Sequence, residues 1–289
     1  MGTARHLRRA LAHTGRVADI AAFSDLDGLM DRARTCTREF SAIVCIGGDA
    51  TLSATAIAAM RLDVPFVPVP NGFGNIFAGV FRHPQHVSGV LQLLARGELR
   101  RVDVGVATCE RSEDVFLSHR SYGFLEQIQQ IAEQGRQQPK RRLLRLLWYV
   151  RVAGALLFTA RLSAFKLEID GTPVTDDAAL ITVANVETYR GFLPLTPTAS
   201  PIDGLFDVCV IPRVPAVVLL FRLLRVMLGL PGRWRGVAVY RGRRVAVTTP
   251  RRREELAVRR RALPLLVPPG AIDALQNRTV HDTPPISTP

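Results

Sequence analysis

The residues best suited to chemistry lie in two glycine-rich loops in the first third of the chain. GGDAT at residues 47–51 follows the apolar run 43–46, and PNGFGN at residues 70–75 follows a second apolar run at 64–69. Each loop opens into a helix-like segment, so backbone N–H groups and helix N-termini would converge where parallel strands end. This pattern predicts a two-loop site for the phosphates of a nucleotide.

The first loop supplies both a sharp turn and a carboxylate. Gly47 and Gly48 allow the backbone to turn and to approach a ligand closely. Asp49 could orient a metal-bound phosphate or accept a hydroxyl proton, and the Thr51 hydroxyl is expected to cap the following helix at residues 52–60. The alternative is a plain strand-turn-helix with an Asx turn.

The second loop repeats this arrangement one β-α-β unit later. Gly72 and Gly74 flank Phe73, and Asn75 precedes a helix start, so amide donors are expected to face the same crevice. The chain has no GxxxxGK[ST], full GxGxxG, HRD or DFG motif, which argues against common NTPase and protein-kinase folds. Later, SPIDGLFD at 200–207 places two carboxylates around a turn, a pattern that favours a turn over a metal site.

The surrounding sequence predicts two domains. Residues 1–105 alternate helical segments with apolar strands, which is typical of an α/β nucleotide-binding domain. Residues 106–275 are rich in strands and turn signals such as Asp-Gly, and residues 276–289 are predicted to be a disordered tail. Two apolar helical segments, 143–160 and 216–228, are interrupted by arginines, so they are expected to pack or dock at an interface rather than span a membrane.

Composition indicates a globular protein with a basic second half. The chain of 289 residues is 47% hydrophobic, enough for a packed core, and its four cysteines show no metal-ligand spacing. Because the N-terminus also lacks an apolar signal region, we expect a cytoplasmic protein. Residues 1–135 hold 14 basic and 14 acidic residues, whereas residues 136–289 hold 24 and 11. This excess favours nucleic acid or an acidic lipid surface as partner; the alternative is arginine used as ordinary solubilising charge.

Three ordered blocks together resemble the diacylglycerol kinase catalytic family, which includes bacterial lipid kinases and sphingosine kinases. GGDAT is similar to the family's GGDGT, and PNGFGN followed by Phe77-Ala78 is similar to P-x-GTGN-x-FA. PTASPIDGLFDV at 197–208 resembles P-x-A-x-x-x-DG-x-x-D-V. The resemblance implies an α/β Rossmann-like N-terminal domain and a C-terminal β-sandwich, and ATP- and Mg²⁺-dependent phosphorylation of a lipid hydroxyl.

The resemblance also implies roles for individual residues. Asp49 would be catalytic, and Ser200, Asp203 and the carbonyl of Leu205 would match the family's structural magnesium site. The implied partners are a lipid substrate and an anionic membrane, contacted through basic residues after 135 by a protein peripheral to the inner membrane face. Nucleic acid is not expected, because no reading motif accompanies the arginines. The nucleotide would be held by Gly47, Gly48, Asp49, Ala50, Thr51, Gly72, Phe73 and Asn75, with Ser24 a poorer match for an upstream threonine.

Several positions depart from the family pattern. The family opens with a strand ending in an NP-x-SG loop, and this chain begins after the place of that strand. Ala50 replaces a glycine, which matters if that position needs a positive φ, and Phe73 replaces a small threonine. Residues 256–263 carry arginines where the family has a DGE segment whose acid is proposed as base, and Glu254 or Glu255 would fit only in a shifted register. Two alternatives therefore stay open: a non-catalytic homologue that binds lipid or anionic membrane, and, less favoured by the second and third blocks, an NAD kinase.

Overall fold

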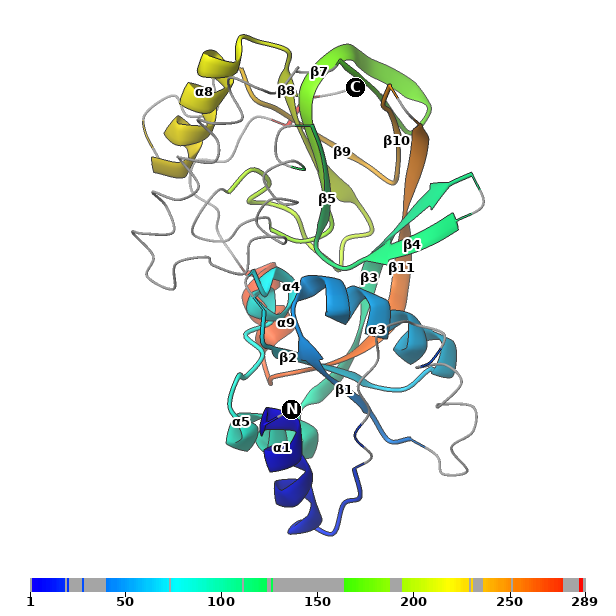
Figure 1. Ribbon diagram of the computed structural model, residues 1–289, viewed down its shortest axis with the longest axis vertical. Helices are drawn as coiled ribbons and strands as arrows, with labels where there is room; N and C mark the ends of the chain where they lie inside the picture. Colours follow the sequence, from blue (N-terminus) through cyan, green and yellow to red (C-terminus); the bar gives the residue numbers. More distant parts are fainter. Residues whose placement is uncertain are drawn as a thin grey trace.

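The protein consists of two units stacked along its long axis (Figure 1). The computed structural model describes residues 2–18, 40–72, 74–110, 112–123, 164–187, 194–228, 236–250 and 252–277, and the single positions 20, 28, 126, 230, 286 and 287. An α/β unit contains the first strands and most helices, and a β-sandwich unit contains most of the antiparallel strands. The structure therefore agrees with the predicted fold class.

The α/β unit places both glycine-rich loops at one edge of its sheet. Strands β1 and β2 are parallel, with Val44 opposite Val67, and α3 connects them. Because the carboxyl ends of parallel neighbours meet at one edge, the loops that follow β1 and β2 are adjacent. The elements of this unit are α1 (Gly2–Ala12), β1 (Ile43–Gly47), α3 (Asp49–Leu62), β2 (Phe66–Pro70), α4 (Ile76–Val80) and α5 (Val87–Arg96).

The second unit is built from antiparallel strands. The β6–β7 hairpin turns at Asp170 and Gly171, whose φ values of 49° and 84° suit a two-residue turn between right-twisted strands. The predicted Asp-Gly turn is therefore present. Its elements are β4 (Ser112–Phe116), β5 (His119–Gly123), β6 (Phe165–Ile169), β7 (Thr172–Ala184), β8 (Phe206–Pro212), α8 (Ala216–Leu228), β9 (Ala238–Gly242) and β10 (Arg244–Thr248). Two long strands, β3 (Glu98–Cys109) and β11 (Arg253–Val267), extend into both units, and α9 (Ala271–Gln276) belongs to the α/β unit.

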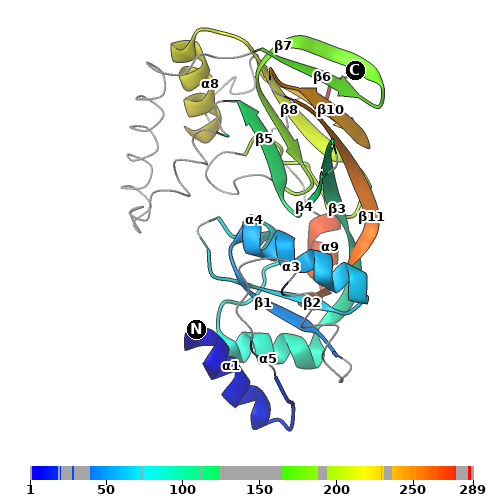
Figure 2. The same cartoon turned by 45° about the vertical axis from the view of Figure 1, so that its right-hand side comes forward.

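Strands β3 and β11 connect the two units (Figures 1 and 2). The first part of β11 pairs with β10, and β11 pairs with β3 on both sides of an irregularity between Arg259 and Leu263. Beyond it, Leu265 pairs in parallel with Phe66 of β2. Residues 263–275, which the predicted domain division places in the second domain, thus return to the α/β unit, because their apolar side chains fill its core.

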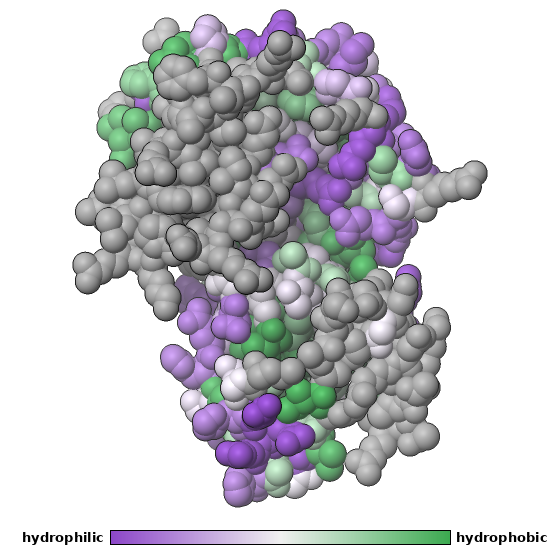
Figure 3. All heavy atoms as spheres, in the orientation of Figure 1, coloured by the Kyte–Doolittle hydropathy of each residue, from purple (hydrophilic) through white to green (hydrophobic). Residues whose placement is uncertain are grey.

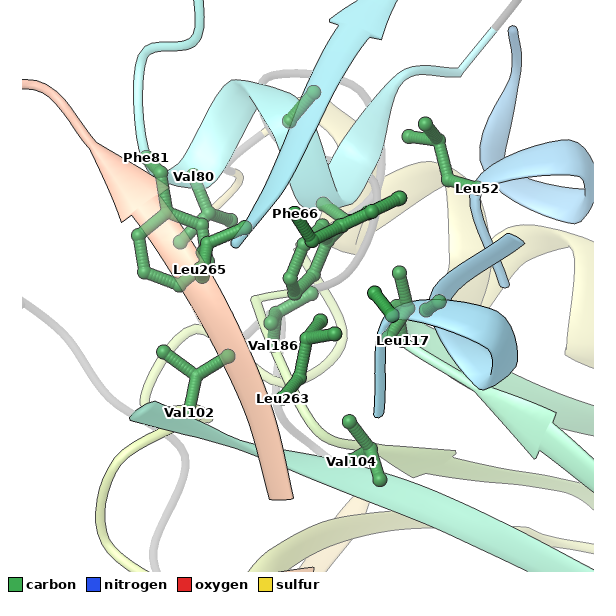
Figure 4. Packing of buried hydrophobic residues seen from close by; sticks show 14 of the residues in the cluster. Leu52, Phe66, Val80, Phe81, Val102, Val104, Leu117, Val186, Leu263 and Leu265 are labelled. Carbon is green, nitrogen blue, oxygen red and sulfur yellow. The ribbon is translucent and has the colours of Figure 1, made fainter. Parts of the chain in front are cut away.

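The core of the α/β unit extends into the junction between the units. Figure 4 shows Leu263 and Leu265 of β11 packed with Phe66 of β2, and all three are fully buried. Val186, just after β7, belongs to the same cluster as Leu117. This shared core fixes the carboxyl ends of β1 and β2 against the sandwich.

Some predicted segments lie outside the described residues or beyond the two cores. The predicted helix at 143–160 and most of the predicted disordered tail are outside the described part of the chain. Within that tail, Ile286 forms an isolated bridge with Val239, and the Ser287 N–H donates to the Val239 carbonyl at 2.7 Å. Within the described residues, no helix combines the length and apolar character needed to cross a bilayer.

Candidate functional site: two glycine-rich loops and an aspartate turn

The first loop forms the start of helix α3. Gly48 is the N-cap, with an extended backbone (φ −91°, ψ −179°) and no capping side chain. The predicted cap at Thr51 is wrong, because the helix begins at Asp49 and Thr51 lies inside its first turn. A Cβ on Gly47 would lie 2.7 Å from the Thr51 Cβ, so this glycine makes room for the threonine. Ala50 is helical and has no positive φ, so alanine is compatible with the backbone here.

The first turn of α3 keeps backbone donors open. Ala50 and Thr51 are exposed, and their N–H groups have no hydrogen-bond partner among the described residues. The Leu52 N–H, by contrast, donates to the Gly48 carbonyl at 2.9 Å. Unpaired N–H groups and the positive end of a 14-residue helix favour an anion at this point.

The second loop uses its donors within the protein. The Gly72 N–H donates to Asn75 Oδ1 at 2.8 Å, and Asn75 Nδ2 donates to the Gly72 carbonyl at 2.8 Å. Asp49 accepts from the N–H groups of Ile76 and Phe77, each at 3.2 Å. The expectation that these amides face a crevice is therefore wrong: a side-chain amide and a carboxylate already pair with them.

The two loops contact each other through backbone atoms. The Asn71 N–H donates to the Gly47 carbonyl at 2.9 Å, and a Cβ on Gly72 would lie 2.3 Å from the Gly48 Cα. Glycine is required at Gly72 by this close approach. Two other predicted nucleotide contacts, Phe73 and Ser24, lie outside the described residues.

Asp49 connects the loops electrostatically. Burial raises the pKa of its carboxyl group, while hydrogen bonds from backbone amides of Ile76 and Phe77 oppose that rise. A Cβ on Gly74 would lie 2.9 Å from Asp49 Oδ2, so the second loop closes tightly over this carboxylate. In this geometry Asp49 holds the start of α4 next to the start of α3.

Residues 200–207, which we call the aspartate turn, follow β7, run into the start of β8 and contain the predicted metal ligands. Asp203 is exposed, its Oδ1 accepts from the Leu205 N–H at 3.0 Å, and Ser200 is half-buried. Although Asp203 is exposed, surrounding protein atoms displace part of the water around its carboxyl group, which raises its pKa, and the nearby carboxylates of Asp207 and Asp103 raise it further. Ile202 packs against the same core as Ile76, so this turn is held to the unit that carries the glycine loops.

The second carboxylate of the turn is fully engaged by protein groups. Asp207 accepts from the Thr198 hydroxyl and from Arg241 Nε, the latter at 2.8 Å. Burial raises the pKa of Asp207, and these two partners oppose the rise. Asp207 thus stabilises the turn. Within the described residues, no group of three or more His, Cys, Asp and Glu side chains is placed to hold a metal ion.

Asp103 is a central residue that sequence reasoning missed. Its side chain is buried, and it accepts from the Gly204 N–H and the Arg261 N–H, each at 2.7 Å. Its own N–H donates to the Pro201 carbonyl at 2.7 Å. Asp103 therefore joins β3, the aspartate turn and the irregular part of β11. A carboxylate between Val102 and Val104 in an apolar strand was the available signal.

Comparison with known proteins identifies the family. The diacylglycerol kinase catalytic domain model matches residues 2–107. The YegS C-terminal NAD kinase beta sandwich-like domain model matches residues 123–260. The chain thus carries a diacylglycerol kinase catalytic domain followed by a YegS-type C-terminal domain. The predicted fold class, an α/β domain followed by a β-sandwich, is confirmed by the same matches.

Individual relatives of the family are distant. An uncharacterised protein of Synechocystis sp. is 27% identical over 171 residues, which are 59% of this chain and 38% of that protein. A diacylglycerol kinase of Staphylococcus aureus is 21% identical over 189 residues, 65% of this chain and 58% of that enzyme. The aligned region thus spans less than two thirds of either relative. The crystal structure of a diacylglycerol kinase from Bacillus anthracis superposes with a TM-score of 0.63 at 16% identity, covering 88% of this chain and 86% of that one.

The region in which the family resemblance predicts a DGE segment is basic in this chain. Arg259, Arg260 and Arg261 are exposed at the irregularity of β11, and Arg261 has a positive φ of 47°. The Arg260 side chain lies over Gly204 of the aspartate turn, because a Cβ there would lie 2.5 Å from Arg260 Nε. The guanidinium group of Arg260, which does not lose a proton in proteins, therefore lies against the turn that contains Asp203.

The two glutamates nearest to this region in sequence, Glu254 and Glu255, do not replace the acid of the expected DGE segment. Glu254 is buried and accepts from the Tyr122 hydroxyl at 2.6 Å and from Arg120 Nη2 at 2.7 Å. Burial, together with the Glu254 charge, raises the pKa of Tyr122, so the phenol remains a donor. Glu255 is exposed, with Arg253 Nε 3.5 Å from it. The buried Glu254 thus serves the sandwich rather than the aspartate turn.

Proposed function

We propose that the protein transfers the γ-phosphoryl group of ATP to the hydroxyl group of a lipid, as a kinase of the diacylglycerol kinase type. The observation that carries this proposal is the contact between the two glycine-rich loops at the carboxyl ends of β1 and β2. Open sheets bind nucleotides at this edge. The match to the catalytic domain model and a diacylglycerol kinase among the relatives support the reaction class.

The first loop is the part suited to nucleotide phosphates. Its open N–H groups at Ala50 and Thr51 lie at the start of α3, where an anion is stabilised by the helix. Gly48 and Gly72 leave this surface free of side chains. The second loop has a structural role. Asn75 and Asp49 hold it against the first loop, so Gly48 and Gly72 stay in contact.

The aspartate turn is suited to a divalent cation. Asp203 would provide the carboxylate, with Ser200 and the Leu205 carbonyl as further oxygen ligands, which Mg²⁺ prefers. Carboxylates that raise one another's pKa favour a cation nearby, and Asp203 is raised in part by Asp207 and Asp103. A Mg²⁺ held at this turn would be structural, whereas Mg²⁺ bound together with ATP would neutralise charge on the phosphates.

Asp49 is the acid whose replacement tests the proposal. Purified protein is incubated with labelled ATP, Mg²⁺ and a panel of diacylglycerol, sphingoid and glycolipid acceptors. We expect transfer by the wild type and a loss of about 10²-fold or more in Asp49→Asn, because the loop geometry and any proton transfer both depend on this carboxylate. Asp63→Asn is the matched control, since Asp63 is an exposed aspartate at the other end of α3. No transfer above Asp49→Asn with any acceptor would rule the proposal out.

A second candidate is a non-catalytic homologue that binds lipid or anionic membrane. The arginines at 259–261 favour it, because they stand where an acid is expected and Glu254 is closed off by Arg120 and Tyr122. The thermal stability of the protein with and without Mg²⁺-ATP separates the two. A clear increase in melting temperature with Mg²⁺-ATP supports the kinase, whereas no increase in a folded protein supports the non-catalytic homologue. In either case we propose a cytoplasmic protein with a peripheral position on the inner membrane face.

A further inference from the structure

Helix α8 carries apolar side chains on both of its faces. Its inner face is buried through Leu219, Leu223 and Val226. Its outer face presents Val217, Phe221 and Leu228, which are 67%, 56% and 55% exposed. At 3.6 residues per turn these three positions fall within about 40° of one another around the helix. The outer face of a surface helix is normally polar, so this exposed apolar stripe needs a partner.

The apolar stripe lies on the outside of the sandwich unit. Figure 3 shows hydrophobic residues at the upper left edge of the molecule, where Figure 1 places α8. The helix has 13 residues, which is too short to span a bilayer but long enough to lie along its surface. It belongs to the unit opposite the two glycine-rich loops.

The charged residues that flank the stripe along the chain are all basic. Residues 208–253 contain eleven arginines and no aspartate or glutamate. Two of these arginines belong to α8: the guanidinium carbon of Arg225 lies 5.6 Å from the centre of the Phe221 ring, and Arg222 Nη1 donates to the Gly236 carbonyl at 3.1 Å. One acid from another strand is close, because Asp177 pairs with Arg213 just before the helix. The apolar face is therefore flanked by cations along the helix itself.

We propose that the outer face of α8 inserts into the interface of an anionic phospholipid bilayer. Val217, Phe221 and Leu228 would enter the boundary between headgroups and acyl chains, and Arg225 would stay at headgroup level with its aliphatic stem along the apolar surface. An acidic lipid surface complements both the stripe and its arginines. The proposal deepens the proposed function, since it brings a lipid kinase to the surface that holds its acceptor, but it rests on α8 alone.

The test measures how much protein sediments with vesicles of phosphatidylcholine containing 30% phosphatidylglycerol. We expect the double variant Phe221→Ser/Leu228→Ser to lower the partition coefficient by about tenfold or more, because two apolar side chains are lost from the inserted face. Val17→Ser/Leu99→Ser is the matched control, since these residues of the α/β unit are 80% and 54% exposed and equally apolar. The control is expected to bind within about twofold of the wild type.

Charge supplies a second, independent readout. Arg225→Gln should weaken binding to the anionic vesicles by about fivefold at low salt, and the difference should shrink as salt is raised. Binding to pure phosphatidylcholine should change little in this variant. The variant Phe221→Trp keeps an apolar side chain at this position and adds a fluorescent reporter. After subtraction of the parent spectrum, its tryptophan emission should shift to shorter wavelength when anionic vesicles are added.

The results of these experiments distinguish a bilayer from a second copy of the chain as the partner of the stripe. Unchanged partition of the Ser variant, an equal loss in the control pair, or no emission shift from Phe221→Trp would overturn the proposal. A change in oligomeric state of the Ser variant without vesicles, together with unchanged partition, would instead assign the stripe to a second copy of the chain. Phosphorylation of the water-soluble acceptor dioctanoylglycerol tests the kinase separately, because it needs no bilayer. If that reaction fails while α8-dependent vesicle binding persists, only the proposed function falls.

Discussion

The two glycine-rich loops are alike in sequence but differ in the use of their backbone N–H groups. In the first loop, the donors of Ala50 and Thr51 have no partner among the described residues. In the second, Gly72 donates to Asn75, and Ile76 and Phe77 donate to Asp49. A glycine-rich loop after a strand can therefore either keep backbone donors open for a ligand or use them to hold a neighbouring loop in shape.

A further hydrogen bond fixes the segment just after α4, which follows the second loop. His83 is buried, and its Nε2 lies 2.9 Å from the Leu266 carbonyl of β11, so the neutral ring donates there. Asp49 thus holds the start of α4 and His83 holds the segment after it. Among the described residues, by contrast, no side chain caps the first loop, because its N-cap is Gly48.

The largest expected effect is a loss of folding stability at low pH, caused by protonation of His83. Burial lowers the pKa of His83 to about 4, from 6.5 in the unfolded chain. The folded protein therefore requires the neutral ring, and the stability present above pH 6.5 is lost as pH falls through about 4. We expect His83 to contribute a loss of about 3 kcal/mol in the free energy of unfolding between these limits, in addition to the loss from His119, whose pKa burial also lowers to about 4. Urea titrations across this range measure it.

His83→Gln removes the titration and keeps a donor for the Leu266 carbonyl. This variant should lose less stability on acidification than the wild type, and the difference should be about 3 kcal/mol at pH 4. His86→Gln, three residues later at an exposed position, is the matched control. If His83→Gln and the wild type lose equal stability on acidification, His83 is not the cause of the acid sensitivity.

The next prediction tests whether Gly72 is needed for its close contact with Gly48 or only for the flexibility of glycine. Gly72→Ala places a Cβ 2.3 Å from the Gly48 Cα, which is a clash with backbone that no side chain can relieve. We expect a loss of about 2 kcal/mol or more in the free energy of unfolding. Gly79→Ala is the matched control within α4, because nothing lies within 4 Å of its added Cβ, and it should gain about 0.5 kcal/mol. If both variants have similar stability, the two loops do not contact each other in solution.

The local parts of this site were predictable from sequence. Apolar runs at 43–46 and 64–69, each followed by glycines, correctly predicted two strands with adjacent loops, since short-range patterns determine a β-α-β unit. The same pattern says nothing about which donors stay open. That depends on whether a distant carboxylate reaches them, as Asp49 reaches Ile76 and Phe77.

The junction between the units was beyond the reach of local patterns. The pairing of Leu265 with Phe66 and the bridge from Asp103 to Gly204 and Arg261 join residues far apart in the chain. Such contacts leave no periodic signal at either end. Family resemblance indicated the motif blocks but not this return of β11, which is why the predicted second domain extended to residue 275.

A smaller effect is expected at Asn75, which closes the second loop. Asn75 has a φ of 49° and exchanges two hydrogen bonds with Gly72. Asn75→Gly keeps the conformation but loses both bonds, so we expect a loss of about 1 kcal/mol. Asn75→Ala should lose about 1 kcal/mol more, because alanine is strained in the left-handed region. Chemical denaturation of the two variants measures both steps, and equal stabilities would show that the positive φ is not required.

The smallest effect is expected in the first loop, at the position where the family has glycine. Ala50 is helical and exposed, so Ala50→Gly relieves no strain and only adds flexibility to the first turn of α3, with a loss of about 0.5 kcal/mol. The increase in melting temperature caused by Mg²⁺-ATP should be the same for the variant and the wild type, because the N–H of residue 50 is present in both. A larger increase in Ala50→Gly would mean that the bound loop needs a backbone conformation that alanine resists, and the first loop would then change shape on binding instead of offering its donors preformed.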